Sequence, residues 1–264
     1  MNLSLQGKLA VVTGSTAGIG FAIAGALASE GVRVVINGRT QARVDAALGK
    51  LRLKNRGAEF SGVAADLGTA SGVDTLLKKA PDADILVNNL GIFEVKAFLE
   101  IPDADWRRFF EVNVLSGVRL SRHYLPAMLK KNWGRIIFIS SESAQQIPVE
   151  MIHYGMTKTA QVSIANGIAR SVAGTGVTVN SVLAGPTASE GAGNFVQEMA
   201  RQQGVSAAEI ERQFFSSARP TSLLKRFETP EEVAAVVAFV ASAPAGVMNG
   251  AAVRAEGGVV QSIF

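Results

Sequence analysis

The sequence contains no cysteine and only two histidines among its 264 residues. Without cysteine there is no disulfide framework, no thiolate nucleophile and no thiolate metal site. A histidine-rich metal centre is not expected either, because His123 and His153 are the only imidazoles. We therefore expect a protein without a bound metal, and the lack of cysteine favours the reducing cytoplasm as its location.

Charged residues are also sparse, at 18% of the chain, although the formal net charge is +4. The basic residues are scattered, and the longest runs are pairs such as Arg107-Arg108 and Lys130-Lys131. A nucleic-acid surface needs a basic stripe, so we expect no nucleic-acid partner. Two uncharged stretches, 9–29 and 233–253, are broken by polar residues and glycine, so we expect a soluble protein without a membrane partner.

Short β-branched runs alternate with longer helical patterns along the chain. Helices are predicted over residues 19–30, 103–130 and 151–173. Strands are predicted at 8–13, 32–37, 59–66, 84–89, 134–140 and 176–183. Because these strands are apolar on both faces, they predict a parallel sheet with helices on both sides. The expected fold class is α/β, a doubly wound Rossmann-type sheet of about seven strands in one domain over residues 1–264.

Residues 187–226 depart from this alternation. The segment is rich in Gly, Ser, Gln and Glu, with helical patterns around 194–204 and 206–215. Long insertions between a strand and a helix often carry function. We expect a substrate-binding loop or lid here, and the alternative is a plain surface excursion.

A glycine-rich stretch, TGSTAGIG at 13–20, lies between the first predicted strand and the first helix. Gly14, Gly18 and Gly20 would let the backbone approach a pyrophosphate closely, and the helix N-terminus would supply N–H donors. Close packing also selects glycine, but the position after the first strand of a doubly wound pattern favours a nucleotide site.

The second predicted strand ends in Asn37-Gly38-Arg39-Thr40. A carboxylate at this place would bind ribose hydroxyls and repel a 2′-phosphate. With no carboxylate and with Arg39 available to bind a phosphate, the charges favour NADPH (NADP+) over NADH. The alternative is that Arg39 is a solvated residue at a helix start.

These residues, with others in a fixed order, resemble the short-chain dehydrogenase/reductase family over residues 8–260, essentially the whole chain. Each motif is weak alone, but the ordered set is specific. The matching stretches are TGSTAGIG (13–20), Asp66, NNLG (88–91), Asn113, Ser141, YGMTK (154–158), AGPTAS (184–189) and NGAAVRAEGG (249–258).

The resemblance implies four catalytic residues. Tyr154 would be the general acid/base at the carbonyl oxygen, and Ser141 would hold that oxygen. Lys158 would bind the nicotinamide ribose, and Asn113 would interrupt its helix, position a water and link Lys158 to a proton relay. Tyr154 and Lys158 also share a helical face by their spacing of four. We expect Lys158 and a cationic nicotinamide to lower the pKa of Tyr154.

The resemblance also implies a set of cofactor-binding positions. They are Gly14, Ser15, Thr16, Gly18, Ile19, Gly20, Arg39, Thr40, Asp66, Leu67, Asn89, Leu90, Gly91, Tyr154, Lys158, Gly185, Pro186, Thr187 and Ser189. Three positions depart from the common family pattern: Leu90 replaces alanine, Ala184 replaces proline, and Ser189 stands for threonine while keeping a hydroxyl. None of these changes removes a catalytic group.

The expected activity is NADPH-dependent interconversion of a ketone or aldehyde with an alcohol, as in a carbonyl reductase. The alternative is an NADP(H)-binding regulatory protein that keeps the fold without turnover. A small-molecule substrate of medium size that is at least partly apolar is expected, and family members suggest a homo-oligomer, a tetramer or dimer. Those of the expected pocket-wall residues that lie in 187–226 could instead pack in a contact between subunits. The expected wall residues are Phe93, Ile147, Pro148, Met151, Phe195, Met199, Phe214, Phe215, Leu223 and Leu224.

Overall fold

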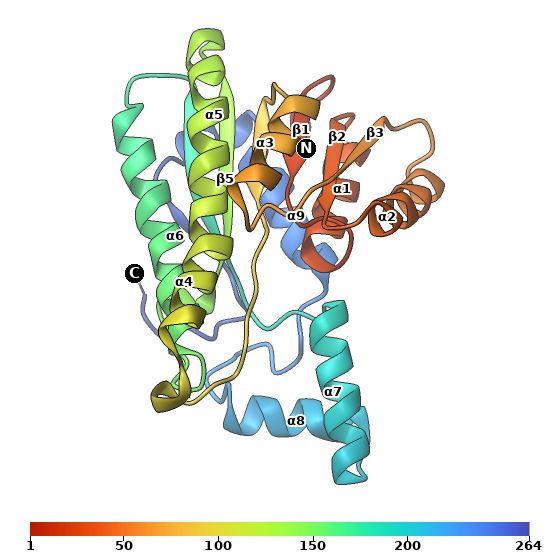
Figure 1. Ribbon diagram of the computed structural model, residues 1–264, viewed down its shortest axis with the longest axis vertical. Coiled ribbons are helices and arrows are strands. Elements are labelled where there is room, and N and C mark those ends of the chain that lie inside the picture. The colour runs from red at the N-terminus through yellow and green to blue at the C-terminus, as the bar shows by residue number, and fades with distance from the viewer. Residues whose placement is uncertain (264) are drawn as a thin grey trace.

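Seven parallel strands form the centre of the molecule (Figure 1). The computed structural model describes residues 1–263, without the side chains of residues 190–192, 194 and 195. The strands are β1 (Leu9–Val12), β2 (Arg33–Gly38), β3 (Phe60–Ala64), β4 (Ile85–Asn88), β5 (Gly134–Ser141), β6 (Val177–Ala184) and β7 (Ala252–Ala255). Their order is β3-β2-β1-β4-β5-β6-β7. The chain thus reverses direction across the sheet between β1 and β4, which confirms the doubly wound class.

Helices cover both faces of this sheet (Figure 1). On one face lie α1 (Gly18–Ser29), α2 (Gln41–Lys54) and α9 (Pro230–Ala241), and on the other α3 (Ala70–Lys79), α5 (Ser116–Lys131) and α6 (Ile152–Ser171). Side chains alternate between the two faces along each strand. Val12 therefore joins the core under α1 and α9, while Val11 joins the core under α5 and α6. This explains why the strands are apolar along their whole length.

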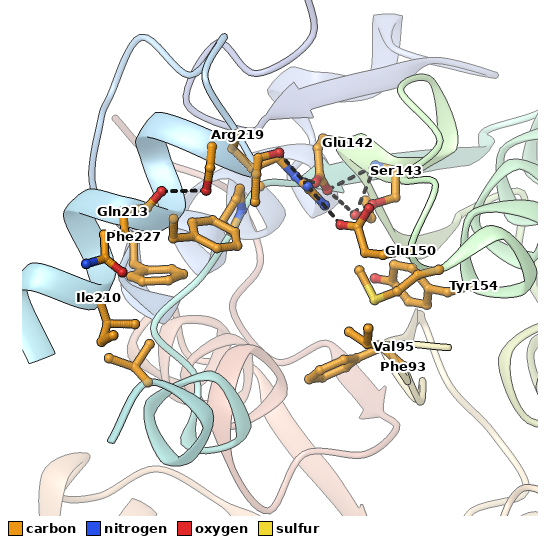
Figure 2. A pocket seen from close by; sticks show the side chains of 18 of the residues that line it. Phe93, Val95, Glu142, Ser143, Glu150, Tyr154, Ile210, Gln213, Arg219 and Phe227 are labelled. Carbon is orange, nitrogen blue, oxygen red and sulfur yellow. Dashed lines mark hydrogen bonds and ion pairs between the residues drawn. The ribbon is translucent and has the colours of Figure 1, made fainter. Parts of the chain in front are cut away.

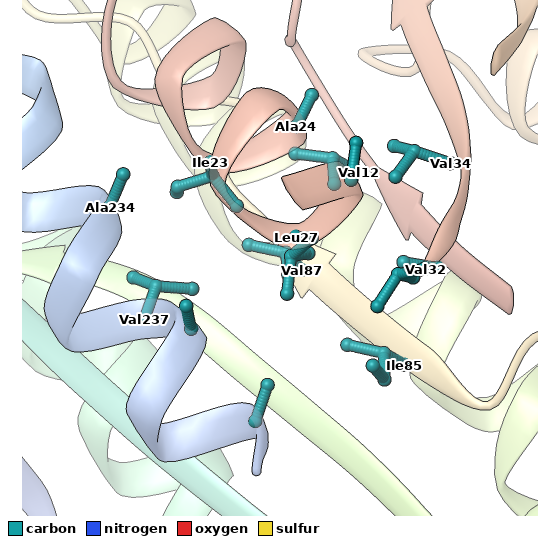
Figure 3. Close-up of a cluster of buried hydrophobic side chains, with 14 of the residues drawn as sticks. Val12, Ile23, Ala24, Leu27, Val32, Val34, Ile85, Val87, Ala234 and Val237 are labelled. Atoms are coloured by element: carbon teal, nitrogen blue, oxygen red, sulfur yellow. The ribbon is translucent and has the colours of Figure 1, made fainter. Parts of the chain in front are cut away.

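Helices α1 and α9 pack together over the strands (Figure 3). Ile23 and Leu27 of α1 and Val237 of α9 are fully buried in this core. Helix α9 begins where Thr229 and Glu232 form reciprocal hydrogen bonds, with Pro230 at the first helical position. Such a capping box satisfies N–H groups that the helix itself leaves open. The start of α9 is therefore fixed by its own sequence.

The predicted helix 103–130 is divided in three by the structure. Helix α4 (Asp103–Phe110) continues into a π-helical turn, Glu111–Leu115, before α5 begins at Ser116. Turns of this kind inside helices are often found at functional sites. The turn contains Asn113, and its interruption of the helix agrees with the expectation from the sequence.

The insertion after β6 contains two helices, α7 (Glu190–Gln203) and α8 (Ala207–Ser217). They extend beyond the carboxyl ends of the strands, away from the body of the sheet (Figure 1). Within residues 1–263, no helix is long and apolar enough to cross a membrane.

We predict that Leu27→Ala lowers the free energy of unfolding by roughly 2–5 kcal/mol, because it leaves a cavity in the core between α1 and the sheet. Leu53→Ala on α2 is the matched control, since Leu53 is 80% exposed, and it should change stability by less than about 0.5 kcal/mol. Urea unfolding followed by circular dichroism measures both. Equal losses in the two variants would contradict this packing.

Candidate active site

The turn between β1 and α1 has a backbone path that requires glycine. Gly14 and Gly18 have φ of +58° and +56°, in the left-handed region. At Gly20 a Cβ would lie 2.4 Å from Asn89 Nδ2 and 2.7 Å from the Gly14 oxygen. Any larger residue at Gly20 would push the turn away from the loop that follows β4.

The N-terminus of α1 is open toward the carboxyl ends of the strands. Ala17 caps the helix without a side-chain hydrogen bond, and the first turn of Gly18–Ser29 holds no acidic residue. The free N–H groups and the positive end of the helix dipole suit an anion such as a phosphate. The residues present therefore fit a dinucleotide.

The loop after β4 closes against the same turn. Asn89 Nδ2 donates to the main-chain oxygens of Thr13 and Gly14 at 2.9 and 3.0 Å. A Cβ on Gly14 would lie 3.2 Å from Leu90 Cα. Leu90, larger than the alanine of the common family pattern, thus packs directly on the glycine turn.

The end of β2 lies beside this turn as well. Asn37 is buried, and its side chain accepts from the Gly14 N–H at 3.2 Å and donates to Val63 and Ala65 oxygens at 3.1 Å. Its amide is therefore committed to the backbone. A Cβ at Gly38 would lie 2.5 Å from Thr16 Cγ2, so the end of β2 packs against the glycine turn. Arg39 follows directly and is exposed.

Two further predicted positions follow β3. Asp66 accepts from the Gly68 N–H at 3.1 Å, and α3 is capped by Thr69 rather than by Asp66. Leu67 is buried, at 1% exposure. The side chain of Leu67 is thus not accessible to a ligand.

Asn113 joins the π-helical turn to two other segments. Its Nδ2 donates to the Ile92 oxygen at 2.9 Å and to Thr157 Oγ1 at 3.0 Å, and its Oδ1 accepts from the Ile92 N–H at 2.8 Å. Gln161 on α6 donates to the Asn113 main-chain oxygen at 2.6 Å. The loop after β4, the turn and α6 are held together by these bonds.

Lys158 is buried behind this group of hydrogen bonds. Its Nζ donates to the Ile139 oxygen at 2.8 Å and to Gln161 Oε1 at 3.3 Å, and it lies 5.5 Å from the ring centre of Tyr154. Burial lowers the pKa of Lys158 to about 8, while the charge of Glu142 acts in the opposite direction. A Cβ on Gly91 would lie 3.4 Å from Nζ, so Gly91 keeps the space beside the ammonium open.

The pKa of Tyr154 differs from the expectation. Burial and then the charge of Glu142 raise it well above the usual value, whereas the Ser141 hydrogen bond and the charge of Arg219 act in the lowering direction. The expected lowering of this pKa is therefore wrong in direction, because burial and the charge of Glu142 outweigh the Ser141 hydrogen bond and the charge of Arg219.

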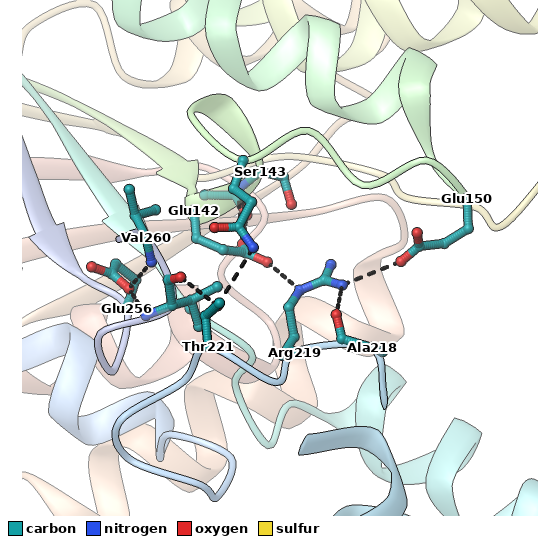
Figure 4. Close-up of polar contacts among 12 residues, drawn as sticks. Glu142, Ser143, Glu150, Ala218, Arg219, Thr221, Glu256 and Val260 are labelled. Carbon is teal, nitrogen blue, oxygen red and sulfur yellow. Dashed lines mark hydrogen bonds and ion pairs between the residues drawn. The ribbon is translucent and has the colours of Figure 1, made fainter. Parts of the chain in front are cut away.

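Glu142, Arg219 and Glu150 are site residues that the sequence did not predict. Arg219 Nε donates to Glu142 Oε1 at 2.9 Å, and its Nη1 donates to Glu150 at 3.3 Å (Figure 4). Glu142 also accepts from the Ser141 hydroxyl. The position of Glu142 directly after Ser141 was a usable signal, but nothing local marks Arg219, which lies 77 positions further along the chain.

A cavity of about 490 Å³ lies between these residues and the insertion. Tyr154 and Phe93 lie on one side of it and Ile210 and Phe227 on the other (Figure 2). Of the expected wall residues, Phe93, Met151, Met199 and Phe214 line it. Phe215 packs against Phe214 and Phe227, Leu223 is 84% exposed, and the side chain of Phe195 lies outside the described residues. The expected walls Ile147, Pro148 and Leu224 are not among its lining residues.

The end of β6 completes the site. Gly185 and Pro186 line the cavity, and the Thr187 hydroxyl donates to the Gly185 oxygen at 2.9 Å. A Cβ on Gly18 would lie 3.3 Å from Ser189 Cβ, so this loop reaches the glycine turn. The predicted positions on β1, β4, β5 and β6 thus meet at one edge of the sheet.

A buried carboxyl supports this loop from behind. Glu228 Oε2 accepts from the Gly185 N–H at 3.2 Å, and among the described residues no group donates to its Oε1. Burial, with a smaller contribution from the charge of Glu256, raises the pKa of Glu228 to about 7.

Comparison with known proteins agrees with this arrangement. The profile of the family described as short chain dehydrogenase matches residues 8–200. An uncharacterised oxidoreductase of Bacillus subtilis (strain 168), YvaG, is 47% identical over the full length of both chains. A D-beta-hydroxybutyrate dehydrogenase of Cupriavidus necator is 32% identical over 97% of this chain and 99% of its own. The structure of L-sorbose reductase from Gluconobacter frateurii, complexed with NADPH and L-sorbose, matches both chains fully with a TM-score of 0.93 and 30% identity.

The chain belongs to the short-chain dehydrogenase/reductase family. It is accordingly an oxidoreductase that acts on CH–OH or C=O groups.

We predict that Glu228→Gln stabilises the protein at about pH 8 by on the order of 3 kcal/mol, from the difference between the usual pKa and about 7. Between the usual pKa of a glutamate and about 7, Glu228 holds a proton in the folded protein and releases it in the unfolded chain. The parent protein therefore loses stability as pH rises toward 7. The gain should shrink at about pH 5, where folded Glu228 is protonated.

Glu231→Gln, at an exposed position of the same region, is the control and should change stability by less than about 0.5 kcal/mol. Urea unfolding at both pH values measures the effect. A gain from Glu228→Gln that is the same at both pH values would contradict the raised pKa.

Proposed function

We propose that the protein is an NADP(H)-dependent oxidoreductase that interconverts a ketone or aldehyde with the corresponding alcohol, using Tyr154 as the general acid/base. The observation that carries this proposal is the meeting of Ser141 and Tyr154 at a cavity that also borders Gly185 and Pro186. Lys158 lies 5.5 Å from the Tyr154 ring and is held by the Asn113–Gln161 hydrogen bonds.

In this proposal a bound nicotinamide dinucleotide supplies the hydride for the carbonyl carbon. Tyr154 gives its hydroxyl proton to the carbonyl oxygen, so that the product is a neutral alcohol. Ser141 donates a hydrogen bond to the same oxygen and stabilises its developing charge. The ammonium of Lys158 favours the tyrosinate that remains, and it would also hold the ribose. Asn113 keeps Lys158 and the loop after β4 in place.

The preference for NADPH is supported by the end of β2. Arg39 is exposed beside the glycine turn, and the neighbouring Asn37 carries no charge. A guanidinium binds a phosphate well, whereas no carboxylate is present here to repel it. The similar L-sorbose reductase was obtained with NADPH.

We further propose that residues 187–226 form a substrate lid. Val196 and Met199 of α7 and Ile210 and Phe214 of α8 line the cavity, which supports this role. The homo-oligomer expected from the family stays a prediction.

Tyr154→Phe should lower turnover by about 10²- to 10⁴-fold, because the proton donor is lost, while NADPH binding is largely retained. The other tyrosine supplies a matched control. Tyr124 is buried and donates to the Ala80 oxygen at 2.6 Å, so Tyr124→Phe should cost about 1 kcal/mol of stability yet keep turnover.

Oxidation of NADPH with a carbonyl panel and fluorescence titration of NADPH measure the two properties of the tyrosine variants. Most of the activity surviving in Tyr154→Phe would refute the mechanism. Tight NADPH binding by a parent protein that turns over no carbonyl would instead support the regulatory alternative.

Arg39→Asp should reverse the cofactor preference, lowering kcat/KM for NADPH by roughly 10- to 100-fold relative to NADH. Arg33→Asp is the control, because Arg33 is exposed at the other end of β2, and it should leave the preference unchanged. Steady-state kinetics with both nucleotides measure this. Equal kcat/KM for NADPH and NADH in the parent would rule out the assigned role of Arg39.

A further inference from the structure

The cavity has two walls of different character (Figure 2). One wall, which includes residues of α8, is mainly apolar, with Ile210, Phe214 and Phe227 among its residues. The wall beside Ser141 carries Glu142, Glu150 and Arg219, which are the charged side chains among the described lining residues. The volume is in the range of sites for small molecules. A ligand here would meet an apolar surface at one end and a carboxylate at the other.

Glu142 is the charged residue nearest to the expected chemistry. It is only 4% exposed. Its Oε1 accepts from Arg219 Nε, and its Oε2 accepts from the Ser143 N–H at 2.9 Å and from the Ser141 hydroxyl. Oε2 therefore lies next to the hydroxyl that is proposed to bind the substrate oxygen.

The Ser141 hydroxyl has a single proton. It can donate either to Glu142 Oε2 or to a substrate oxygen, but not to both at once. When it donates to a substrate carbonyl, Glu142 Oε2 loses one of its two donors and keeps only the Ser143 N–H. The loss of a hydrogen bond to a buried carboxylate costs free energy. A substrate with a hydroxyl on the carbon next to the carbonyl can replace that donor, because the two oxygens on neighbouring carbons lie close together. A ketone without such a hydroxyl has no donor for Glu142 Oε2.

The charges of the wall disfavour an acidic substrate. Two carboxylates and one guanidinium give it a formal charge of −1. The guanidinium is already engaged, since Arg219 donates to Glu142, to Glu150 and to the Ala218 oxygen (Figure 4). A substrate carboxylate would face Glu142 and Glu150 without a cation of its own.

We propose that Glu142 determines substrate specificity, and that the substrate is an uncharged α-hydroxycarbonyl compound whose hydroxyl donates to Glu142 Oε2 while Ser141 and Tyr154 donate to the carbonyl oxygen. This inference rests on the proposed function. Reduction adds one hydride to the carbonyl carbon and one proton to its oxygen, and the neighbouring hydroxyl is unchanged, so the product is a vicinal diol. The apolar wall would hold the rest of the substrate.

Three compounds with the same aromatic group test the proposal. They are 2-hydroxyacetophenone, acetophenone, which lacks the hydroxyl, and phenylglyoxylate, which carries a carboxylate instead. With NADPH in excess, kcat/KM of the parent should be at least about tenfold higher for 2-hydroxyacetophenone than for either other compound. This comparison in the parent needs no variant to fold.

The two ketones also differ in intrinsic reactivity. Comparing their kcat/KM ratio in Glu142→Gln with the ratio in the parent cancels that difference. A glutamine side chain has only one oxygen acceptor. When that oxygen accepts from Arg219, the NH₂ group points toward Ser141, where the parent protein has an acceptor. The ratio of kcat/KM for 2-hydroxyacetophenone over acetophenone should fall by about tenfold relative to the parent. Glu150→Gln is the matched control, since Glu150 also binds Arg219, whereas the Ser141 hydroxyl donates to Glu142, and it should keep the parent ratio.

The outcomes separate the two proposals. Reduction of acetophenone or phenylglyoxylate as efficiently as 2-hydroxyacetophenone would overturn the assignment of the substrate class and leave the proposed function standing. A folded Glu142→Gln protein with the parent ratio would overturn the role of Glu142. Turnover of none of the three compounds would count against both the function and the inference.

Discussion

The burial of the Lys158 ammonium is the constraint on which the rest of the site depends. A buried charge costs several kcal/mol unless hydrogen bonds compensate it. Here the compensation comes from the Ile139 oxygen on β5 and from Gln161 on α6, and Gln161 in turn binds the main chain of Asn113. The π-helical turn at 111–115 places that main chain within reach. The fold thus holds β5, α6 and the turn in one arrangement, and Tyr154 is placed by it.

A second group of charges controls the other side of Tyr154. Burial and then the charge of Glu142 raise the pKa of Tyr154, and the charge of Arg219 opposes them. Arg219 follows the end of α8, so the insertion contributes charge to the site as well as apolar surface. In the proposed function, proton transfer by Tyr154 therefore depends on how the insertion is seated, since Arg219 brings positive charge toward a tyrosine that is otherwise hard to ionise.

Local sequence patterns predicted the fold and the glycine turn, and the family resemblance implied most of the other residues that gather at the sheet edge. Parallel strands bring their carboxyl ends together, so Gly14, Asn89, Ser141 and Gly185 had to meet once the strands were recognised. The Glu142–Arg219 pair could not be predicted, because its partners are 77 positions apart and neither belongs to a recurring motif. Apolar composition also does not tell which way a side chain points. Leu223 was expected in the pocket wall and is instead exposed to solvent.

The central claim is direct transfer of hydrogen from NADPH to a carbonyl carbon at Tyr154. It is tested most directly with NADPH deuterated at both C4 positions and 2-hydroxyacetophenone as substrate. Mass spectrometry of the diol should find one deuterium, located on the new carbinol carbon. An unlabelled diol would show that this hydrogen comes from solvent, which would contradict the account.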